Sequence, residues 1–349
     1  YVPINWIAGL FYFNEDFSIE TTNYDSIFTG QPNWLLGQQQ ETTAYAAFGH
    51  LDWDVAENWR IGAGIRYSHD EKDFSAIRTD SPIFLQGDWP SPFGPIVESP
   101  DDSKTTWDLS ATWFMNDEIN WYARVATGFR APSIQGRLLF GNTVSVAESE
   151  TSISYEAGVK MFLGGGRARV NFNVFNYDVD DAQLTAVGGE FNFNQIINAN
   201  QVNGQGFELD LQTRVTDNFT LTASLGYTET EIKDADLAVA PCSAPCTVLD
   251  PAGAVEGSVL IDGNPLPQSP KITASVIADY VQRFDAGELF VTGDWVYRDE
   301  INFVLYEAAE YRGQSLSEIG LRVGWRFGEG NHEVSAFGVN ILDRTENIY

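Results

Sequence analysis

Apolar and polar residues alternate one by one along much of the chain. The alternation is clearest at residues 59–68, 219–228 and 319–327. Within residues 59–68, one set of alternate positions reads Trp, Ile, Ala, Ile, Tyr, and the other reads Arg, Gly, Gly, Arg, Ser. A period of two is that of a β-strand whose two faces meet different surroundings. The pattern predicts an all-β chain with strands of about 10 residues, a length that crosses a bilayer when the strand is tilted.

Short turns and long polar segments alternate between these strands. The predicted turns are rich in Gly, Asn and Asp and lie at residues 57–58, 116–117, 164–166, 217–218, 285–287 and 329–330. The long polar segments lie at residues 17–41, 71–102, 131–150, 178–201, 231–270 and 299–314. Such alternation is typical of a transmembrane antiparallel β-barrel of the outer-membrane type, with short periplasmic turns and long outer loops. Tryptophan and other aromatic residues beside the turns fit an interfacial girdle.

The strand count predicts an incomplete barrel. One strand at residues 6–16 and two strands for each of the six turns give about 13 strands. Single-chain bacterial barrels close with an even number of strands. We therefore expect this chain to be an interior part of a larger barrel, with residues 340–349 as the loop before one further strand.

The alternation also assigns faces. We expect one set of side chains to face lipid: Ile61, Ala63, Ile65, Leu321 and Val323. Gly62 and Gly64 are expected to face the lumen.

Composition narrows the function classes. The 349 residues include 20 basic and 49 acidic residues, a net charge of −29, and this charge excludes a nucleic-acid binder. Aromatic residues make up 13% of the chain, which excludes disorder. No run of about 18 uncharged apolar residues occurs, so no transmembrane helix is predicted.

The sequence offers little catalytic or metal chemistry. His50, His69 and His332 are far apart in the sequence, and no zinc, nucleophile-elbow, phosphate-loop or dinucleotide motif occurs. Three aspartates, Asp178, Asp180 and Asp181, could bind Ca²⁺ together. They are better interpreted as part of a solvated acidic loop. Residues 164–167 resemble a phosphate cradle but are better interpreted as a hairpin turn. We predict no enzyme activity, no metal and no cofactor.

The two cysteines lie close together in a proline-rich stretch. Cys242 and Cys246 are separated by three residues. The spacing favours a small disulfide loop in an oxidising compartment. Two free thiols or a metal site are the alternatives.

Four short segments carry a family resemblance. Residues 128–133 are similar to a mid-barrel Phe-Arg-Ala-Pro segment, and residues 155–160 to a Tyr-Glu-x-Gly-x-Lys strand. Residues 206–209 are similar to a Gly-x-Glu strand, and residues 340–343 to an Asn-Leu-x-Asp segment before the last strand. In this order they resemble the barrel of the TonB-dependent outer-membrane receptors.

The resemblance implies that residues 1–349 are part of such a barrel domain. Barrels of this plugged class have 22 strands, so about nine strands would lie outside the chain. Nothing in the sequence resembles the family's plug domain, its TonB-contacting box or its closing strand. The plug domain is therefore expected outside this chain.

The resemblance further implies a function in the bacterial outer membrane. It predicts TonB-dependent import of a scarce solute, most commonly a ferric siderophore, and otherwise cobalamin, haem or a saccharide. The implied partners are this ligand, TonB through the absent N-terminal region, and outer-membrane lipid and lipopolysaccharide. Two alternatives remain: a passive porin or structural barrel, and a secreted all-β carbohydrate-binding or hydrolytic protein.

The ligand of such a barrel would enter from outside, so its site is expected in the long loops and the outer lumen. Hydrogen-bond donors beside flat apolar side chains can bind an aromatic chelate or a sugar ring. The predicted ligand-binding residues are Trp89, Phe93, Arg130, Gln135, Arg137 and Phe140. The alternative is that Arg130 and Arg137 pair with acidic residues such as Glu148 and Glu150.

Overall fold

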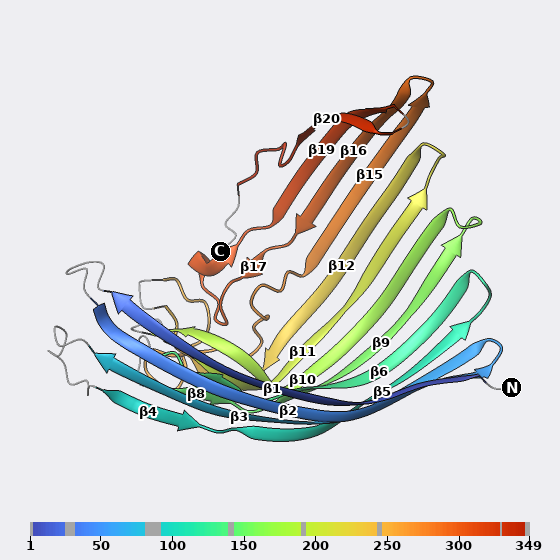
Figure 1. The fold of residues 1–349 in the computed structure, drawn as a ribbon. Coiled ribbons are helices and arrows are strands. Elements are labelled where there is room, and N and C mark those ends of the chain that lie inside the picture. The colour runs from blue at the N-terminus through green and yellow to red at the C-terminus, as the bar shows by residue number, and fades with distance from the viewer. Residues whose placement is uncertain are drawn as a thin grey trace.

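One large antiparallel sheet makes up most of the molecule. A computed structural model describes residues 3–24, 32–80, 92–138, 143–189, 193–242, 246–328 and 330–345. Thirteen strands follow one another in the sheet in the order β1-β2-β3-β5-β6-β9-β10-β11-β12-β15-β16-β19-β20, and the short β4 pairs with β3. The sheet curls into an open shell with short turns at one end and longer connections at the other (Figure 1). The predicted all-β fold and its 13 strands are confirmed.

The strand bounds are as follows. The sheet contains β1 (Ile4–Tyr24), β2 (Pro32–Ala56), β3 (Trp59–Asp80), β4 (Phe93–Glu98), β5 (Asp101–Phe114), β6 (Ile119–Arg130), β9 (Glu150–Leu163), β10 (Ala168–Gly188), β11 (Phe193–Arg214), β12 (Phe219–Lys233), β15 (Ile272–Phe284), β16 (Gly287–Arg298), β19 (Leu316–Phe327) and β20 (His332–Gly338). The connections contain β7 (Ser133–Gln135), β8 (Ser145–Ala147), β13 (Ala238–Val239), β14 (Val259–Leu260), β17 (Ile301–Asn302), β18 (Arg312–Gly313) and the 3₁₀ helix η1 (Ala309–Tyr311). No helix in the described residues is long and apolar enough to cross a membrane.

The turn between β9 and β10 is a hairpin, as the sequence predicts. Gly164, Gly165 and Gly166 have φ values of 62°, 66° and 86°. This left-handed conformation is readily available to glycine and strained for most other residues. The three glycines are therefore used for the tight turn and not for a phosphate cradle.

Several strands are much longer than the predicted 10 residues. β1 has 21 residues and β2 has 25, so most of the predicted loop at residues 17–41 is strand. In the same way, β3 continues to Asp80, and β10 and β11 extend deep into the predicted loop at residues 178–201. In the extensions of β1 and β2, backbone pairing continues where most side chains on both faces are polar, and such a stretch carries little apolar alternation to detect.

The register separates an apolar outer face from a polar inner face. On the outer face, Ile61 pairs with Ala111, Ala111 with Ala123, and Ala123 with Ala157. On the inner face, a Cβ added to Gly64 would collide with the carboxylate of Asp108 and the ring of His50. The glycines of the inner face thus leave room for polar side chains of neighbouring strands.

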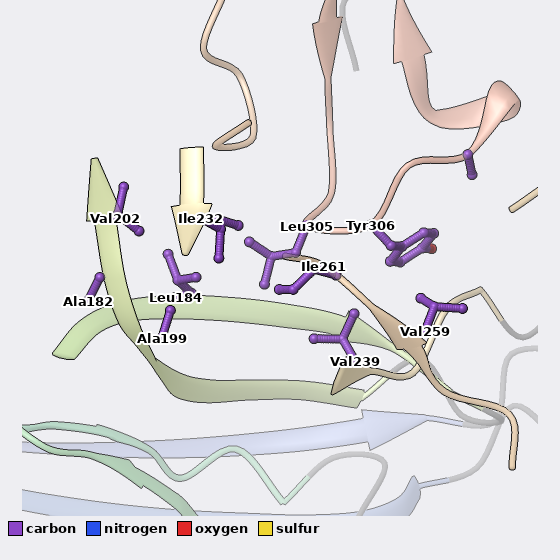
Figure 2. Packing of buried hydrophobic residues seen from close by; sticks show 11 residues of the cluster. Ala182, Leu184, Ala199, Val202, Ile232, Val239, Val259, Ile261, Leu305 and Tyr306 are labelled. Carbon is purple, nitrogen blue, oxygen red and sulfur yellow. The ribbon is translucent and has the colours of Figure 1, made fainter. Parts of the chain in front are cut away.

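The largest buried cluster lies where the outer connections fold over the ends of β10, β11 and β12. We call it the loop core; Figure 2 shows its side chains meeting from the strands and the connections. Its buried members are Ala182, Leu184, Ala199, Val202, Ile232, Val239, Val259, Ile261, Leu305, Tyr306 and Ala308. Burial raises the pKa of Tyr306 to about 12. The connections at residues 234–242, 246–271 and 299–315 are therefore packed structure.

The predicted disulfide is present at the edge of the loop core. Cys242 and Cys246 are bonded, with their Cα atoms 6.5 Å apart, and both side chains pack against the loop core. The backbone N–H of Gly189 donates to the carbonyl of Pro241 at 2.7 Å. The disulfide loop is thus joined to the end of β10.

Candidate ligand-binding site

Residues 131–138 and 143–149, which include the predicted site residues Gln135 and Arg137, fold back against the inner face of the sheet. β7 and β8 pair as a small hairpin, with Ser133 opposite Ala147 and Gln135 opposite Ser145. Both strands contact β11. We call residues 131–138 and 143–149 the inner hairpin.

Two basic side chains of β3 hold one side of the inner hairpin. Arg78 has no exposed surface, and its guanidinium donates to the carbonyl of Leu138 at 3.0 Å. The same guanidinium lies 5.5 Å from the centre of the Phe93 ring, within range of a cation–π interaction. Nearer the turns, the Lys72 ammonium donates to the carbonyl of Pro132. Both cations therefore fix backbone carbonyls of the hairpin.

An apolar contact seals the same side. Leu138 is fully buried and packs with Leu36, Phe74 and Ala76 of β2 and β3. A Cβ added to Gly136 would overlap the Phe74 ring, so the hairpin backbone lies directly on that ring. We expect a side chain at this position to force the hairpin away from β3.

Gln183 of β10 holds the other side of the hairpin. Its amide nitrogen donates to the carbonyls of Ala131, at 2.8 Å, and Glu148, at 2.9 Å. Its amide oxygen accepts from the hydroxyl of Ser133 at 2.6 Å. Both ends of the hairpin thus meet at one buried amide.

Replacing Gln183 should loosen both ends of the hairpin together. Gln183→Ala leaves the carbonyl of Ala131 without this donor, at a cost of about 1–3 kcal/mol, while the carbonyl of Glu148 keeps only the amide of Asn198. We expect faster amide hydrogen exchange at residues 131–136 and 146–149. Gln282→Ala, at the turn end of β15, is the matched control, and equal exchange in both variants would contradict the role of Gln183.

The structure places the predicted site residues unevenly. Phe93 and the hairpin residues come together, because Arg78 contacts both Phe93 and Leu138. The Gln135 amide oxygen accepts from the backbone N–H of Arg137 at 3.1 Å, and the Arg137 side chain is exposed. Trp89 and Phe140 lie outside the described residues.

The ion-pair alternative holds for one of the two arginines. Arg130 Nη1 lies 3.7 Å from Glu150 Oε1 at the junction of β6 and β9. The Arg130 charge is therefore shared with a carboxylate of the barrel wall. No ion pair of Arg137 occurs among the described residues.

The sequence gives no signal for Lys72, Arg78 or Gln183. In the sequence, each of them is an ordinary polar residue of a predicted strand or loop. Its role depends on a contact with the inner hairpin, which is distant in the sequence. In the part of the chain that the structure describes, no group of three or more His, Cys, Asp or Glu side chains could hold a metal ion.

An antiparallel sheet with an apolar outer face, a polar inner face and a hairpin fixed inside defines a membrane β-barrel of the outer-membrane class. The family model "TonB dependent receptor-like, beta-barrel" matches residues 3–341, and the chain belongs to this family. Members of the family are receptors and transporters, not enzymes.

Relatives at the sequence level include a pesticin receptor and an iron-regulated outer membrane virulence protein. The chain is 26% identical over 169 residues to the pesticin receptor of Yersinia pestis, covering 48% of this chain and 23% of that protein. It is 26% identical over 222 residues to the iron-regulated outer membrane virulence protein of Vibrio cholerae, covering 57% of this chain and 29% of that protein. The chain thus spans less than a third of the length of these relatives.

Solved structures share the fold. The ferric yersiniabactin uptake receptor of Yersinia pestis superimposes with a TM-score of 0.75 at 19% identity, covering 98% of this chain and 46% of that one. The ferric-catecholate import receptor of E. coli K12 gives a TM-score of 0.70 at 13% identity, covering 98% of this chain and 48% of that one. At these identities the likeness supports the fold.

Proposed function

We propose that the protein imports an iron complex across the bacterial outer membrane in a TonB-dependent manner. The inner hairpin carries this proposal. A passive porin needs an open, water-filled interior, whereas here a hairpin lies against the inner face and is fixed on two sides by Arg78, Leu138 and Gln183. A secreted hydrolase or lectin would not need an apolar outer face on every long strand.

The proposal that the imported solute is an iron complex rests on the proteins that the chain resembles. The relatives include an iron-regulated outer-membrane protein, and the structural neighbours include uptake receptors for ferric yersiniabactin and ferric catecholates. We further propose that residues 1–349 are part of the barrel domain of a longer receptor. The plug domain and the segment that contacts TonB would then lie outside this chain.

Uptake of labelled iron tests this function. Cells with the intact receptor gene, with the gene deleted, and with TonB inactivated are supplied with ⁵⁵Fe bound to the chelators that the cells secrete under iron limitation. We expect uptake only in the cells with both receptor and TonB. Uptake that persists without TonB would favour a passive channel.

The proposed ligand site combines Trp89, Phe93, Arg130, Gln135, Arg137 and Phe140. Both arginines are exposed, but Arg130 is paired with Glu150, whereas the described residues contain no ion pair of Arg137. A guanidinium next to flat aromatic side chains can bind an oxygen-rich chelate by paired hydrogen bonds.

Replacing Arg137 should weaken binding without unfolding the barrel. We expect Arg137→Ala to reduce the affinity for the imported complex by about 1 kcal/mol or more. The affinity is measured by quenching of intrinsic fluorescence in detergent, and heat-modifiable migration on gels reports the fold. Arg167→Ala, at the turn between β9 and β10 on the opposite end, is the control. Equal affinities of both variants would remove Arg137 from the site.

A further inference from the structure

A cavity of about 250 Å³ lies on the inner face of the barrel wall, over β2, β3, β5 and β6. At its centre, Gly64 of β3 pairs with His50 of β2 on one side and with Asp108 of β5 on the other. A Cβ at Gly64 would collide with both of these side chains, which therefore lean over the strand toward each other. The charged side chains of the cavity thus belong to the inner face, and the cavity is luminal.

The cavity lies deeper in the barrel than the inner hairpin. Arg66 lines the cavity, and Lys72, which holds the hairpin, follows it by six residues on β3. Six residues of a strand span about 20 Å. On the apolar outer face at the same level, Ile65 pairs with Trp107. The cavity is therefore within the membrane-spanning part of the wall and separate from the proposed ligand site.

The carboxylate of Asp108 has two basic neighbours but no hydrogen-bond donor. His50 Nδ1 lies 3.8 Å from Asp108 Oδ1, and Arg124 Nη2 lies 3.9 Å from Asp108 Oδ2. Both separations exceed hydrogen-bonding distance. Among the residues that the structure describes, the Asp108 carboxylate accepts no hydrogen bond. Because a half-buried carboxylate is normally hydrogen-bonded, this one favours a ligand that donates.

Arg66 brings a second guanidinium to the cavity. Its Nε donates to the hydroxyl of Ser68 at 2.9 Å, and its guanidinium carbon lies 5.5 Å and 5.7 Å from the ring centres of Phe11 and Phe48. In the described part of the chain, Arg66 has no ion pair, and neither of its Nη groups donates a hydrogen bond. Arg124 donates no hydrogen bond to a described residue either. Both arginines therefore keep N–H groups for a ligand.

The net charge of the cavity is positive, although the whole chain carries a net charge of −29. Two arginines and one aspartate line the cavity, together with His50. Asp52 lies 3.5 Å from His50 Nε2 and does not line the cavity. A ligand with a single negative charge would balance the charged groups that line the cavity.

These groups together define the chemistry of a ligand. A carboxylate accepts paired hydrogen bonds from guanidinium groups, and a hydroxyl can donate to the Asp108 carboxylate. An α-amino acid also combines a carboxylate with a donor, but it is neutral overall and leaves the cavity charge unbalanced. A phosphate monoester places nearly two negative charges beside Asp108. A hydroxycarboxylate supplies the donor with only one negative charge.

We propose that this luminal cavity binds a hydroxycarboxylate. Arg66 and Arg124 bind the carboxylate, Asp108 accepts from the hydroxyl, and His50 keeps the Asp108 side chain over Gly64. The proposal concerns binding on the inner wall of the barrel and does not depend on which solute the receptor imports.

Binding of small acids to the full-length protein in detergent tests the proposal by saturation-transfer NMR. The probes share one carbon skeleton. Lactate carries the carboxylate and the hydroxyl, propionate lacks the hydroxyl, lactamide lacks the charge, and alanine carries an ammonium in place of the hydroxyl. We expect lactate to bind about fivefold or more tightly than each of the other three, because each of them loses a charge-assisted hydrogen bond or the balance of charge.

Two variants separate the two contacts. Asp108→Ala removes the acceptor, so propionate should bind as tightly as lactate. Arg124→Gln removes one guanidinium, so the preference for lactate over lactamide should fall several-fold. Arg169→Gln removes a guanidinium from a different luminal cavity, beside β11 and β12, and should retain both preferences. Heat-modifiable migration verifies that each variant folds.

Absence of lactate binding, or equal affinity for lactate and propionate in the unaltered protein, would overturn the proposal. Tighter binding of alanine would indicate a site for zwitterions and would also overturn it. A preference for lactate over propionate that persists in folded Asp108→Ala would contradict the role of Asp108. If Asp108→Ala does not fold, Arg124→Gln still decides, because the Arg124 side chain is 53% exposed. An unchanged preference over lactamide in that variant would overturn the site.

Discussion

Ala223→Arg should destabilise the barrel by about 2–4 kcal/mol, because it places a charge on the lipid face near the middle of a transmembrane strand. Ala223 lies at the centre of the apolar outer row of β12 and pairs with Leu211 and Val276. The neighbouring residue Thr222 points to the inner face, opposite Gln212 and Ile277. Thr222→Arg should therefore be tolerated at nearly the same depth. The free energy of unfolding is measured by denaturant titration of the protein in lipid vesicles.

Arginine substitutions at Ala223 and Thr222 of β12 test the assignment of the two faces better than substitutions at Ile65 and Gly64 of β3. Ile65 is 60% exposed on the outer face and suits the test, but any side chain at Gly64 collides with Asp108 and His50. Gly64→Arg would thus destabilise the protein for a steric reason unrelated to lipid. Thr222 instead borders a luminal space of about 230 Å³ that also contains Asp210, a partner for a new guanidinium. Equal loss of stability in Ala223→Arg and Thr222→Arg would contradict the assignment of faces.

The strand count could be predicted because apolar and polar residues alternate in each strand that crosses the membrane. In β12, every outer position from Phe219 to Tyr227 is apolar and the inner ones are Thr, Ser or Gly, so the alternation is visible without a structure. The outward extensions of β1 and β2 could not be predicted in this way. Opposite Thr21 and Thr22 stand Leu36 and Leu35, and most of the side chains around them are polar on both faces. Backbone hydrogen bonds maintain these extensions, and they leave no pattern in the side chains.

The candidate site was predictable only in its local parts. The pairing of Arg130 with Glu150 was one of two alternatives that the sequence offered, and the structure contains it. The bonds that fix the inner hairpin join residues far apart in the chain: Arg78 and Leu138 are 60 residues apart, and Gln183 and Ala131 are 52 apart. A single sequence shows which residues can donate, but the strand order around the barrel decides which carbonyls they meet.

Leu138→Ala should detach the inner hairpin from β3 while the sheet remains intact. Leu138 has no exposed surface and fills the space between Leu36, Phe74 and Ala76. Truncating a fully buried leucine costs about 2–5 kcal/mol, partly as lost apolar burial and partly as a cavity. The loss falls mainly on the hairpin, because the strands are held independently by their backbone ladders. We expect faster hydrogen exchange and new protease cleavage at residues 131–138, with unchanged heat-modifiable migration.

The same variant links rigidity to ligand binding. If the hairpin presents Gln135 and Arg137 in a fixed arrangement, its release adds an ordering cost to binding, and the affinity for the iron complex should fall without any contact being removed. Leu163→Ala, at the turn end of β9, is the matched control, because this leucine is 37% exposed and distant from the hairpin. Fast exchange in Leu138→Ala with unaltered affinity would mean that the ligand does not depend on the hairpin. In that case the binding groups belong to the other outer connections, which the loop core already holds in place.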